Sequence, residues 1–492
     1  MRALLLIGWM SLGACTATPW GLGMSADKAT TDHGTKNGLV VMLGEEAFAR
    51  ASARLTNAIQ KGWPDGMVIQ GEVSFDGQTV GLSDLTLAYD EVWLDFGLIE
   101  VDGGSDSIGA KLSVKSPFVD IRIMDGDDEI CAQTLSMHGL IDGRIALGQD
   151  KLGRVEGTMI DATMIGVEKT GETFGNCDYA LGPVVFHDAL QEVGQSIASS
   201  VSLELGPVLE QSLPAALGLN LAMDYLFTVG DNEGSYGLGW GHVRANPTPD
   251  ESFWTYEDGR LAAPFAVAMD AEPAMCVPDY GTHEPESAAL PPFGNREDTV
   301  LFVNADVATQ ALNVAWRTGL VCDDRLAVAA ELNVDLVGDF WPALEKFGGA
   351  SRLSVRLWPQ EPPTFVIETL GEGAFLRVET GRLRMEIMVE YDDTWLRAAT
   401  LEATVELEGP LLVDTEGSVY FDPIAIDVTT IESIDGLNRG PDPTVVDAIA
   451  ETLVQFVVRD QPLLTLPPMA TEAGLLSIEL EGDYLSFSKV SD

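Results

Sequence analysis

Basic residues are scarce in this chain of 492 residues: 28 Lys and Arg stand against 77 Asp and Glu, which gives a formal net charge of −49. A surface this acidic would repel a phosphate backbone, so a nucleic-acid partner is not expected. The chain is nevertheless 46% hydrophobic and only 21% charged, a balance that excludes a disordered polymer. Its 50 glycines and 25 prolines favour a turn-rich β architecture.

Local signatures of catalysis and metal binding are also missing. The chain has no G-x-S-x-G, no C-x-x-C and no H-x-x-x-H, and its five histidines are scattered. His138 and His187 are interpreted as structural or surface groups, and Asp125 to Glu129 as an acidic turn without EF-hand spacing. The sequence therefore predicts a non-enzymatic protein with no metal and no cofactor. A hydrolase remains the enzymatic alternative, because the members of a convergent triad are distant in the chain.

No stretch of 18 or more apolar residues follows the amino terminus, so a membrane-spanning helix is not predicted. The terminus itself combines Arg2, the short apolar run 4–10 and Leu12-Gly13-Ala14-Cys15, which resembles the lipobox of bacterial lipoproteins. We expect residues 1–14 to be a signal peptide, Cys15 to be acylated and residues 15–37 to form a flexible tether. Thr16 favours the outer membrane, and a plain secretory signal is the alternative.

Cysteines are few, with four after Cys15: Cys131, Cys177, Cys276 and Cys322. An even number in an exported chain predicts two disulfides, and four cysteines allow three connectivities. The pairs Cys131–Cys177 and Cys276–Cys322 are favoured because each falls within one predicted half of the chain.

Periodic apolar positions predict a helix, many strands and a long helix in the first half. Apolar residues recur at helical spacing over 44–59, at alternate positions in strands as far as about residue 167, and again at helical spacing over 186–209. Gly206-Pro207 should kink the long helix, and Leu213-Pro214 should end it nearby. Residues 246–249 (Asn-Pro-Thr-Pro) are the best linker candidate.

The second half repeats this pattern. Thr299 to Val303 is a predicted strand, and Asn304 should cap a helix that stops at Gly319. Strands are expected between 325 and 427, a second amphipathic helix from Asp442 to Phe456, and a terminal strand from Leu476. The predicted units are residues 38–245, a linker and central region over 246–298, and residues 299–492.

This order of elements resembles the family of bactericidal/permeability-increasing protein, lipopolysaccharide-binding protein and cholesteryl ester transfer protein, whose domains are called tubular lipid-binding (TULIP) domains. Supporting matches are Tyr236-Gly237-Leu238 before the proline-rich linker and Leu466-Pro467 before the final strand. The resemblance implies an α+β fold of two tandem domains, each a long twisted antiparallel sheet wrapped around a long amphipathic helix, joined through a central sheet. It also implies a disulfide between Cys131, in a strand, and Cys177, just before the long helix.

The function implied is binding, and transfer between membranes, of lipids or other hydrophobic molecules in apolar tunnels. The residues expected to line the first tunnel are Phe48, Leu55, Ile59, Val193, Ile197, Val201 and Leu205; those of the second are Val307, Leu312, Val446, Ile449 and Leu453. Each could instead be packed core. The acidic turn disfavours anionic lipid phosphates, so a neutral or zwitterionic lipid fits better, although acidity is also typical of adaptation to salt. A surface adhesion or scaffold lipoprotein built from β-sandwiches, without a lipid ligand, is the alternative from another class.

Overall fold

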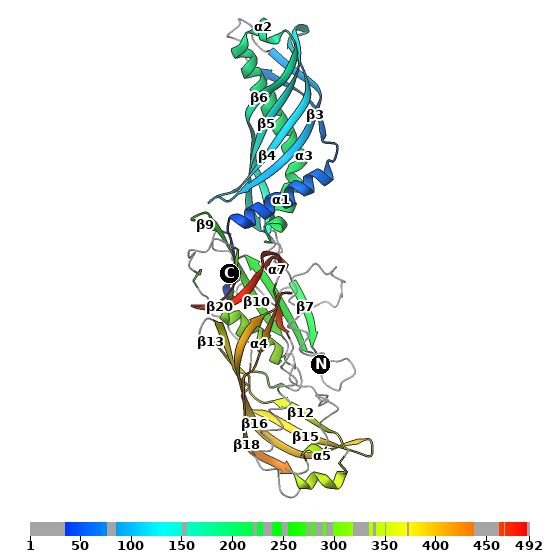
Figure 1. Ribbon diagram of the computed structural model, residues 1–492, viewed down its shortest axis with the longest axis vertical. Helices are drawn as coiled ribbons and strands as arrows, with labels where there is room; N and C mark the ends of the chain where they lie inside the picture. Colours follow the sequence, from blue (N-terminus) through cyan, green and yellow to red (C-terminus); the bar gives the residue numbers. More distant parts are fainter. Residues whose placement is uncertain are drawn as a thin grey trace.

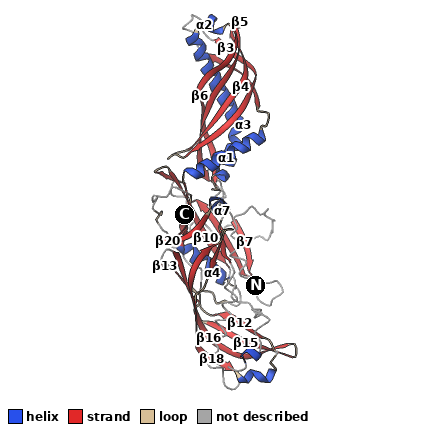
Figure 2. Cartoon of the chain, in the orientation of Figure 1, coloured by secondary structure: helices blue, strands red, loops and turns tan. Residues whose placement is uncertain are grey.

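The computed structural model describes most of the chain after residue 34. The described ranges are 35–75, 85–149, 155–219, 224–229, 239–247, 254–271, 273, 277–280, 289–291, 299–317, 334–337, 341–349, 351–370, 373–436, 462–466 and 468–489. The strands in these ranges form three antiparallel sheets, which follow one another along the long axis of the molecule (Figure 1). Strands dominate all three parts, and a long helix runs beside the first sheet (Figure 2).

The first sheet is a meander of long strands. In spatial and chain order they are β2 (Met67–Phe75), β3 (Leu85–Asp102), β4 (Ile108–Asp125), β5 (Asp128–Gln149) and β6 (Val155–Gly175). Alternate side chains are buried, as in Val119, Ile121 and Ile123 of β4, each at most 1% exposed. The predicted period of two therefore corresponds to a sheet with one apolar face, which lies against helices.

Three helices accompany this sheet: α1 (Glu45–Gly62), α2 (Cys177–Leu181) and α3 (Pro183–Ala216). The 34 residues of α3 correspond to a length of about 51 Å at 1.5 Å per residue. It continues past Pro207 and ends two residues after Pro214, close to the predicted end. Both helices predicted in this half are thus present, and α3 packs along the strands of the first sheet (Figure 1).

The central sheet brings together distant parts of the chain. Its strands are β1 (Thr35–Leu43), β7 (Asp224–Val229), β8 (Gly239–Pro247), β9 (Thr255–Glu257), β10 (Arg260–Ala271), β11 (Val300–Asn304), β20 (Leu475–Glu481) and β21 (Tyr484–Lys489). They lie in the order β20-β21-β11-β1-β10-β8-β7, with β9 paired to β10. Val41 of β1 is opposite Ala263 on one side and Leu301 on the other, so segments more than 200 residues apart share a ladder.

Two predictions near this sheet have different outcomes. Asn246 and Pro247, expected to begin a linker, are instead the last residues of β8 and pair with β10. A proline can occupy a strand end because few ladder hydrogen bonds are lost there. Asn304 caps a helix as predicted: its Oδ1 accepts a 2.7 Å hydrogen bond from the Asp306 backbone N–H at the start of α4 (Ala305–Arg317).

The third sheet is organised around one long strand. Its strands are β12 (Leu353–Pro359), β13 (Thr364–Leu370), β14 (Gly373–Glu379), β15 (Leu383–Tyr391), β16 (Thr394–Val413), β17 (Ser418–Phe421), β18 (Ala425–Gly436) and β19 (Pro462–Thr465). β16 pairs with β15, β14 and β17 at successive positions, and with β18 over positions that also pair with β15 and β14. The remaining helical segments are α5 (Val334–Val337), the 3-10 helix η4 (Pro342–Phe347) and α7 (Pro468–Ala473). The helix predicted over 442–456 lies outside the described residues.

Side-chain contacts join α1 and the first sheet to the central region. Arg50 of α1 donates a 2.8 Å hydrogen bond from Nη2 to Thr299 Oγ1, just before β11. The Trp254 indole donates to the Gly104 carbonyl, 3.1 Å away, at the β3–β4 turn. Together with the ion pair between Lys489 of β21 and Glu46 of α1, these contacts attach the base of the first unit to the central sheet.

Candidate functional site

The candidate site is the apolar interior between α3 and the first sheet. One stripe of α3 is completely buried: Val193, Ile197, Val201 and Leu205 are each at most 2% exposed. These residues recur every four positions, so they lie on one side of the helix and face the alternate apolar side chains of the strands. The interior extends along most of α3 and forms one continuous core with the neighbouring strands.

Helix α1 covers the base of this interior. Phe48, Leu55 and Ile59 are buried at 7%, 1% and 1% exposure. On the same helix, Ser52 Oγ accepts a 2.9 Å hydrogen bond from the Val101 backbone N–H, and Thr56 Oγ1 accepts one of 3.0 Å from Ile99. β2 pairs with β3 only as far as Leu94, so Ile99 and Val101 lie beyond the end of that ladder, where these hydroxyls act as acceptors for their N–H groups. Apolar packing and local hydrogen bonds together hold α1 in place.

Buried charge is absent from the described part of this unit. Among the described residues of α1 to α3 and β2 to β6, the buried polar side chains are Thr56, Ser116 and Gln133, and no Asp, Glu, Lys or Arg is buried. Ionic contacts lie outside: Arg144 on β5 pairs with Asp161 opposite it on β6, and hydrogen bonding from this guanidinium lowers the pKa of Asp161. The described lining of this interior therefore offers mainly dispersion and apolar contact, with its charged groups on the outside.

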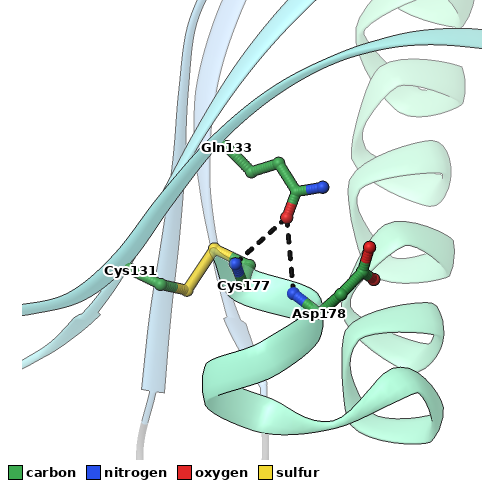
Figure 3. Close-up of a disulfide and its surroundings, with 4 residues drawn as sticks. All are labelled: Cys131, Gln133, Cys177 and Asp178. Carbon is green, nitrogen blue, oxygen red and sulfur yellow. Dashed lines mark hydrogen bonds between the residues drawn. A yellow bond between two sulfur atoms is a disulfide. The ribbon is translucent and has the colours of Figure 1, made fainter. Parts of the chain in front are cut away.

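A disulfide fixes the entry into α3. Cys131 of β5 is bonded to Cys177 of α2, with a Cα–Cα distance of 5.2 Å, which confirms the predicted pair. Next to it, Gln133 Oε1 accepts hydrogen bonds from the backbone N–H groups of Cys177 and Asp178, at 3.1 and 3.4 Å (Figure 3). These contacts satisfy the free donors at the start of α2 and connect it to the sheet. Cys15, Cys276 and Cys322 lie outside the described residues.

Helix α3 bridges the two edges of the first sheet, β2 and β6. We call the contact between α3 and β6 the β6 seam, and the contact between α3 and β2, with the adjoining part of β3, the β2 seam. At the β6 seam, Glu210 accepts a 2.7 Å hydrogen bond from the Met159 backbone N–H, and Gln195 donates one of 3.0 Å to the Met164 carbonyl. The free backbone groups of this edge strand are thus partly satisfied by the helix.

The β2 seam is built differently. Tyr89 of β3 and Ser196 of α3 share a hydrogen bond of 2.7 Å between their hydroxyls. The Tyr89 phenol lies across Gly71 of β2, where a Cβ would be only 2.3 Å from the phenol oxygen. A glycine at this position therefore leaves the space through which the phenol reaches the helix.

The predicted lining residues of the first half are all placed in this interior. Phe48, Leu55, Ile59, Val193, Ile197, Val201 and Leu205 belong to one buried cluster. Burial is common to a packed core and to the lining of a lipid chamber, so their ligand role stays a prediction. Sequence reasoning missed Gly71, Tyr89 and Ser196. Tyr89 alternates in step with Leu85 and Leu87, so its burial could be predicted, but no local sequence pattern indicates that it contacts α3.

The residues predicted for the second half are only partly described. Val307 is buried, and its Cγ2 would be 2.9 Å from a Cβ at Gly38 of β1, so it packs on the central sheet. The side chain of Leu312, and Val446, Ile449 and Leu453 altogether, lie outside the described residues.

The described residues contain neither a cluster of metal ligands nor a helix of membrane-spanning character. Within the described ranges, no group of three or more His, Cys, Asp or Glu has an arrangement that could hold a metal ion. None of the helices described is both long enough and apolar enough to cross a membrane.

Comparison with known proteins gives distant structural likeness only. No protein-family model matches the chain, and no curated protein matches its sequence. Among solved structures it is similar to a lipopolysaccharide binding protein, with 13% identity over 92% of this chain and 98% of the other, at a TM-score of 0.41. P47 from Clostridium botulinum A2 has 9% identity over 94% and 98%, at a TM-score of 0.28. P47 of Clostridium botulinum E1 has 8% over 93% and 100%, also at 0.28. These TM-scores are low, so the interior is described from the contacts within this chain alone.

Proposed function

We propose that this protein is a non-enzymatic carrier that binds a lipid or another hydrophobic molecule between α3 and the first sheet. The observation that supports the proposal is the apolar interior beside a 34-residue helix, without a buried charge in the described part of that unit. Helices, and not a second sheet, pack on the first sheet, so this part of the structure does not support the alternative of a β-sandwich scaffold. A tubular lipid-binding unit of this kind is also what the sequence resemblance implies.

Apolar contact supplies enough free energy for such a carrier. Each buried methylene contributes about 0.8 kcal/mol, so an acyl chain of about 16 carbons gains roughly 10 kcal/mol before ordering costs are subtracted. A bilayer holds the same chain by the same effect. Exchange between the protein and a membrane can therefore be close to neutral in free energy, which suits transfer better than permanent storage.

Charge on the outer surface narrows the range of ligands. The β4–β5 turn presents Asp125, Asp127, Asp128 and Glu129, all exposed, on a chain of net charge −49. These carboxylates repel anionic head groups and the surfaces of anionic membranes. A neutral or zwitterionic lipid is the ligand class that this surface tolerates best.

We further propose that the protein is exported and anchored through an acylated Cys15, with the outer membrane as its location. The support is the lipobox-like sequence Leu12-Gly13-Ala14-Cys15. We also propose a second lipid-binding unit over residues 299–492, in which Val446, Ile449 and Leu453 would line the interior.

The decisive experiment is to extract the full chain gently from membranes and identify co-purified hydrophobic molecules by native mass spectrometry and lipid analysis. The expected result is a stoichiometric lipid, greatly reduced in Ala198→Trp, which fills the interior from the buried face of α3. Ser199→Trp, on the exposed side of the same helix, is the matched control and should retain the lipid. Circular dichroism checks that both variants fold. A folded wild type that carries and accepts no lipid would overturn the proposal.

A further inference from the structure

The two seams beside α3 differ in how firmly they are closed. At the β6 seam the helix approaches the backbone closely: a Cβ at Gly157 would be 2.9 Å from the Glu210 carbonyl oxygen, and one at Gly194 would be 2.7 Å from Val167. Two hydrogen bonds add to this packing: Gln195 donates to the Met164 carbonyl, and Glu210 accepts from the Met159 backbone N–H. Separating α3 from β6 would break two hydrogen bonds and open close-packed contacts.

At the β2 seam, one hydrogen bond between side chains joins the helix to the sheet. In the described part of the chain, no hydrogen bond joins α3 to β2, and the Tyr89–Ser196 hydroxyl pair is the one hydrogen bond between α3 and the adjoining strand β3. The β2 side chains Val73 and Phe75 pack against the core but are only partly buried, whereas Leu87 and Leu85, their partners on β3, are fully buried. This edge of the interior is therefore both weakly held and partly open to solvent.

The helix surface beside this seam carries an unusual combination of side chains. Ser196, Ser200 and Leu203 are spaced by four and three residues, so they share one side of α3. Ser196 and Ser200 are partly buried, and Leu203 is 80% exposed. The small hydroxyl residues leave little bulk between helix and strand, and an exposed leucine lies two turns beyond the hydroxyl pair.

We propose that the β2 seam is the lateral entrance to the interior and that the Tyr89–Ser196 pair closes it. This inference rests on the proposed function and adds to it a route and a ligand feature. An acyl chain enters between β2 and α3 as the hydroxyl pair separates, while the β6 seam holds the helix on its other side. The polar end of the ligand stays at the seam, in contact with water.

The hydroxyl pair also indicates what part of the ligand it contacts. Two hydroxyl groups contain two donor hydrogens, and their mutual hydrogen bond uses one of them. No described residue accepts the second hydrogen. An uncharged oxygen next to an acyl chain, such as an ester carbonyl, would satisfy it. The seam therefore favours an ester-containing neutral or zwitterionic lipid over a bare hydrocarbon.

The test blocks the seam after the protein has folded. Ser196→Cys is labelled with a bulky maleimide, with Ser199→Cys on the exposed side of α3 as the matched control, and the unsubstituted chain treated identically reports on its own thiols. Uptake of fluorescent phosphatidylcholine from phosphatidylcholine vesicles is then followed over time. Labelled Ser196→Cys should take up the probe at least about tenfold more slowly than before labelling, while labelled Ser199→Cys should change by less than about twofold.

The outcomes separate this inference from the proposed function. If the unsubstituted chain takes up no probe and carries no lipid, the proposed function fails. If it takes up the probe and labelled Ser196→Cys does so at an unchanged rate, the chain enters elsewhere and the β2 seam is overturned as the entrance.

A second variant opens the seam instead of blocking it. Tyr89→Phe removes the hydroxyl and keeps the ring over Gly71, so uptake and release should both become about two- to tenfold faster, the range expected for one net hydrogen bond. Gln195→Ala, which removes a contact at the β6 seam, is the control and should leave both rates unchanged. Faster exchange in Gln195→Ala but not in Tyr89→Phe would instead indicate the β6 seam as the entrance.

Discussion

Individual polar side chains in this protein hold segments in place at the boundary of an apolar interior. Gln133 accepts two backbone hydrogen bonds at the start of α2, and Ser52 and Thr56 each accept one from the part of β3 that extends beyond its ladder with β2. A buried backbone N–H without a partner costs about 1 to 3 kcal/mol, so these single contacts stabilise the local path of the chain. Among the described residues of α1 to α3 and β2 to β6, the charged side chains lie on the outer surface instead, where water screens them.

One exposed ion pair gives a prediction at this scale. Arg352 donates from Nε and Nη2 to the two oxygens of Glu390, at 2.6 and 2.7 Å, and this bonding holds the pKa of Glu390 below its ordinary value. Arg352→Ala should therefore raise that pKa, which a carboxyl-carbon NMR titration would measure. The pair favours the folded state above the ordinary carboxyl pKa and loses this effect as the pH falls through the lowered value.

Arg356→Ala is the control for that titration, because Arg356 lies opposite Glu386 in the β12–β15 ladder and, among the described residues, has no ion pair or hydrogen bond with Glu390. It should leave the titration of Glu390 unchanged. A Glu390 pKa that is the same with and without Arg352 would contradict the assignment.

At the scale of elements, α3 packs closely against β6 because glycines lie at the points of contact. Gly157 and Gly194 allow a backbone approach that a methyl group would prevent, and Met164 occupies the space above Gly139 and Gly194. Pro207 and Pro214 each lack a backbone N–H, yet the helix continues through both. Packing on the strands therefore outweighs the local preference to end the helix.

Gly157→Ala tests this close approach. Its Cβ would be 2.9 Å from the Glu210 carbonyl oxygen, so helix or strand must shift, and we expect a loss of about 1 to 3 kcal/mol in the free energy of unfolding of this unit. Gly148→Ala is the matched control: it is also in a strand, and a Cβ there meets nothing within 4 Å. Chemical denaturation compares the two. Equal stability of both variants would show that α3 does not press on β6 as described.

Local patterns in the sequence predict these elements well and their partners poorly. The stripe of Val193, Ile197 and Val201 repeats within a few residues, so its helix and its buried side are predictable. The contact between Tyr89 and Ser196 spans 107 positions and depends on how the sheet curves, which no local period records. The sequence favours a linker at Pro247, where β8 in fact ends, because proline and asparagine have the same local preferences in a loop and at a strand end.

The whole molecule combines a net charge of −49 with an elongated series of sheets. Like charges on a folded chain repel one another, and the repulsion destabilises the compact state. At about 0.01 M salt the screening length is about 30 Å, so carboxylates on different sheets act on one another; at about 0.1 M it is about 10 Å. Stability should therefore depend on salt more than in a neutral protein.

The expected result is a melting temperature several degrees higher in about 0.5 M than in about 0.01 M sodium chloride, measured by calorimetry at neutral pH. An uncharged osmolyte at matched osmolality is the control and should reproduce only a small part of the rise. A melting temperature that falls or stays constant with salt would show that specific ion pairs, such as Arg352–Glu390, outweigh the general repulsion.

The pairing within the central sheet constrains the order in which this protein can be assembled. The Tyr484 hydroxyl donates to the carbonyl oxygens of Asn37 and Ala289, and β21 pairs with β11, which pairs with β1. A ribosome or a translocation channel delivers the chain from one end only. The meander of β2 to β6 can form while later segments are still being delivered. In contrast, β11 lacks its second ladder partner, and Asn37 of β1 lacks its hydrogen bond from Tyr484, until the last strand has emerged. Completion of the central sheet is thus a late event in the biogenesis of the molecule.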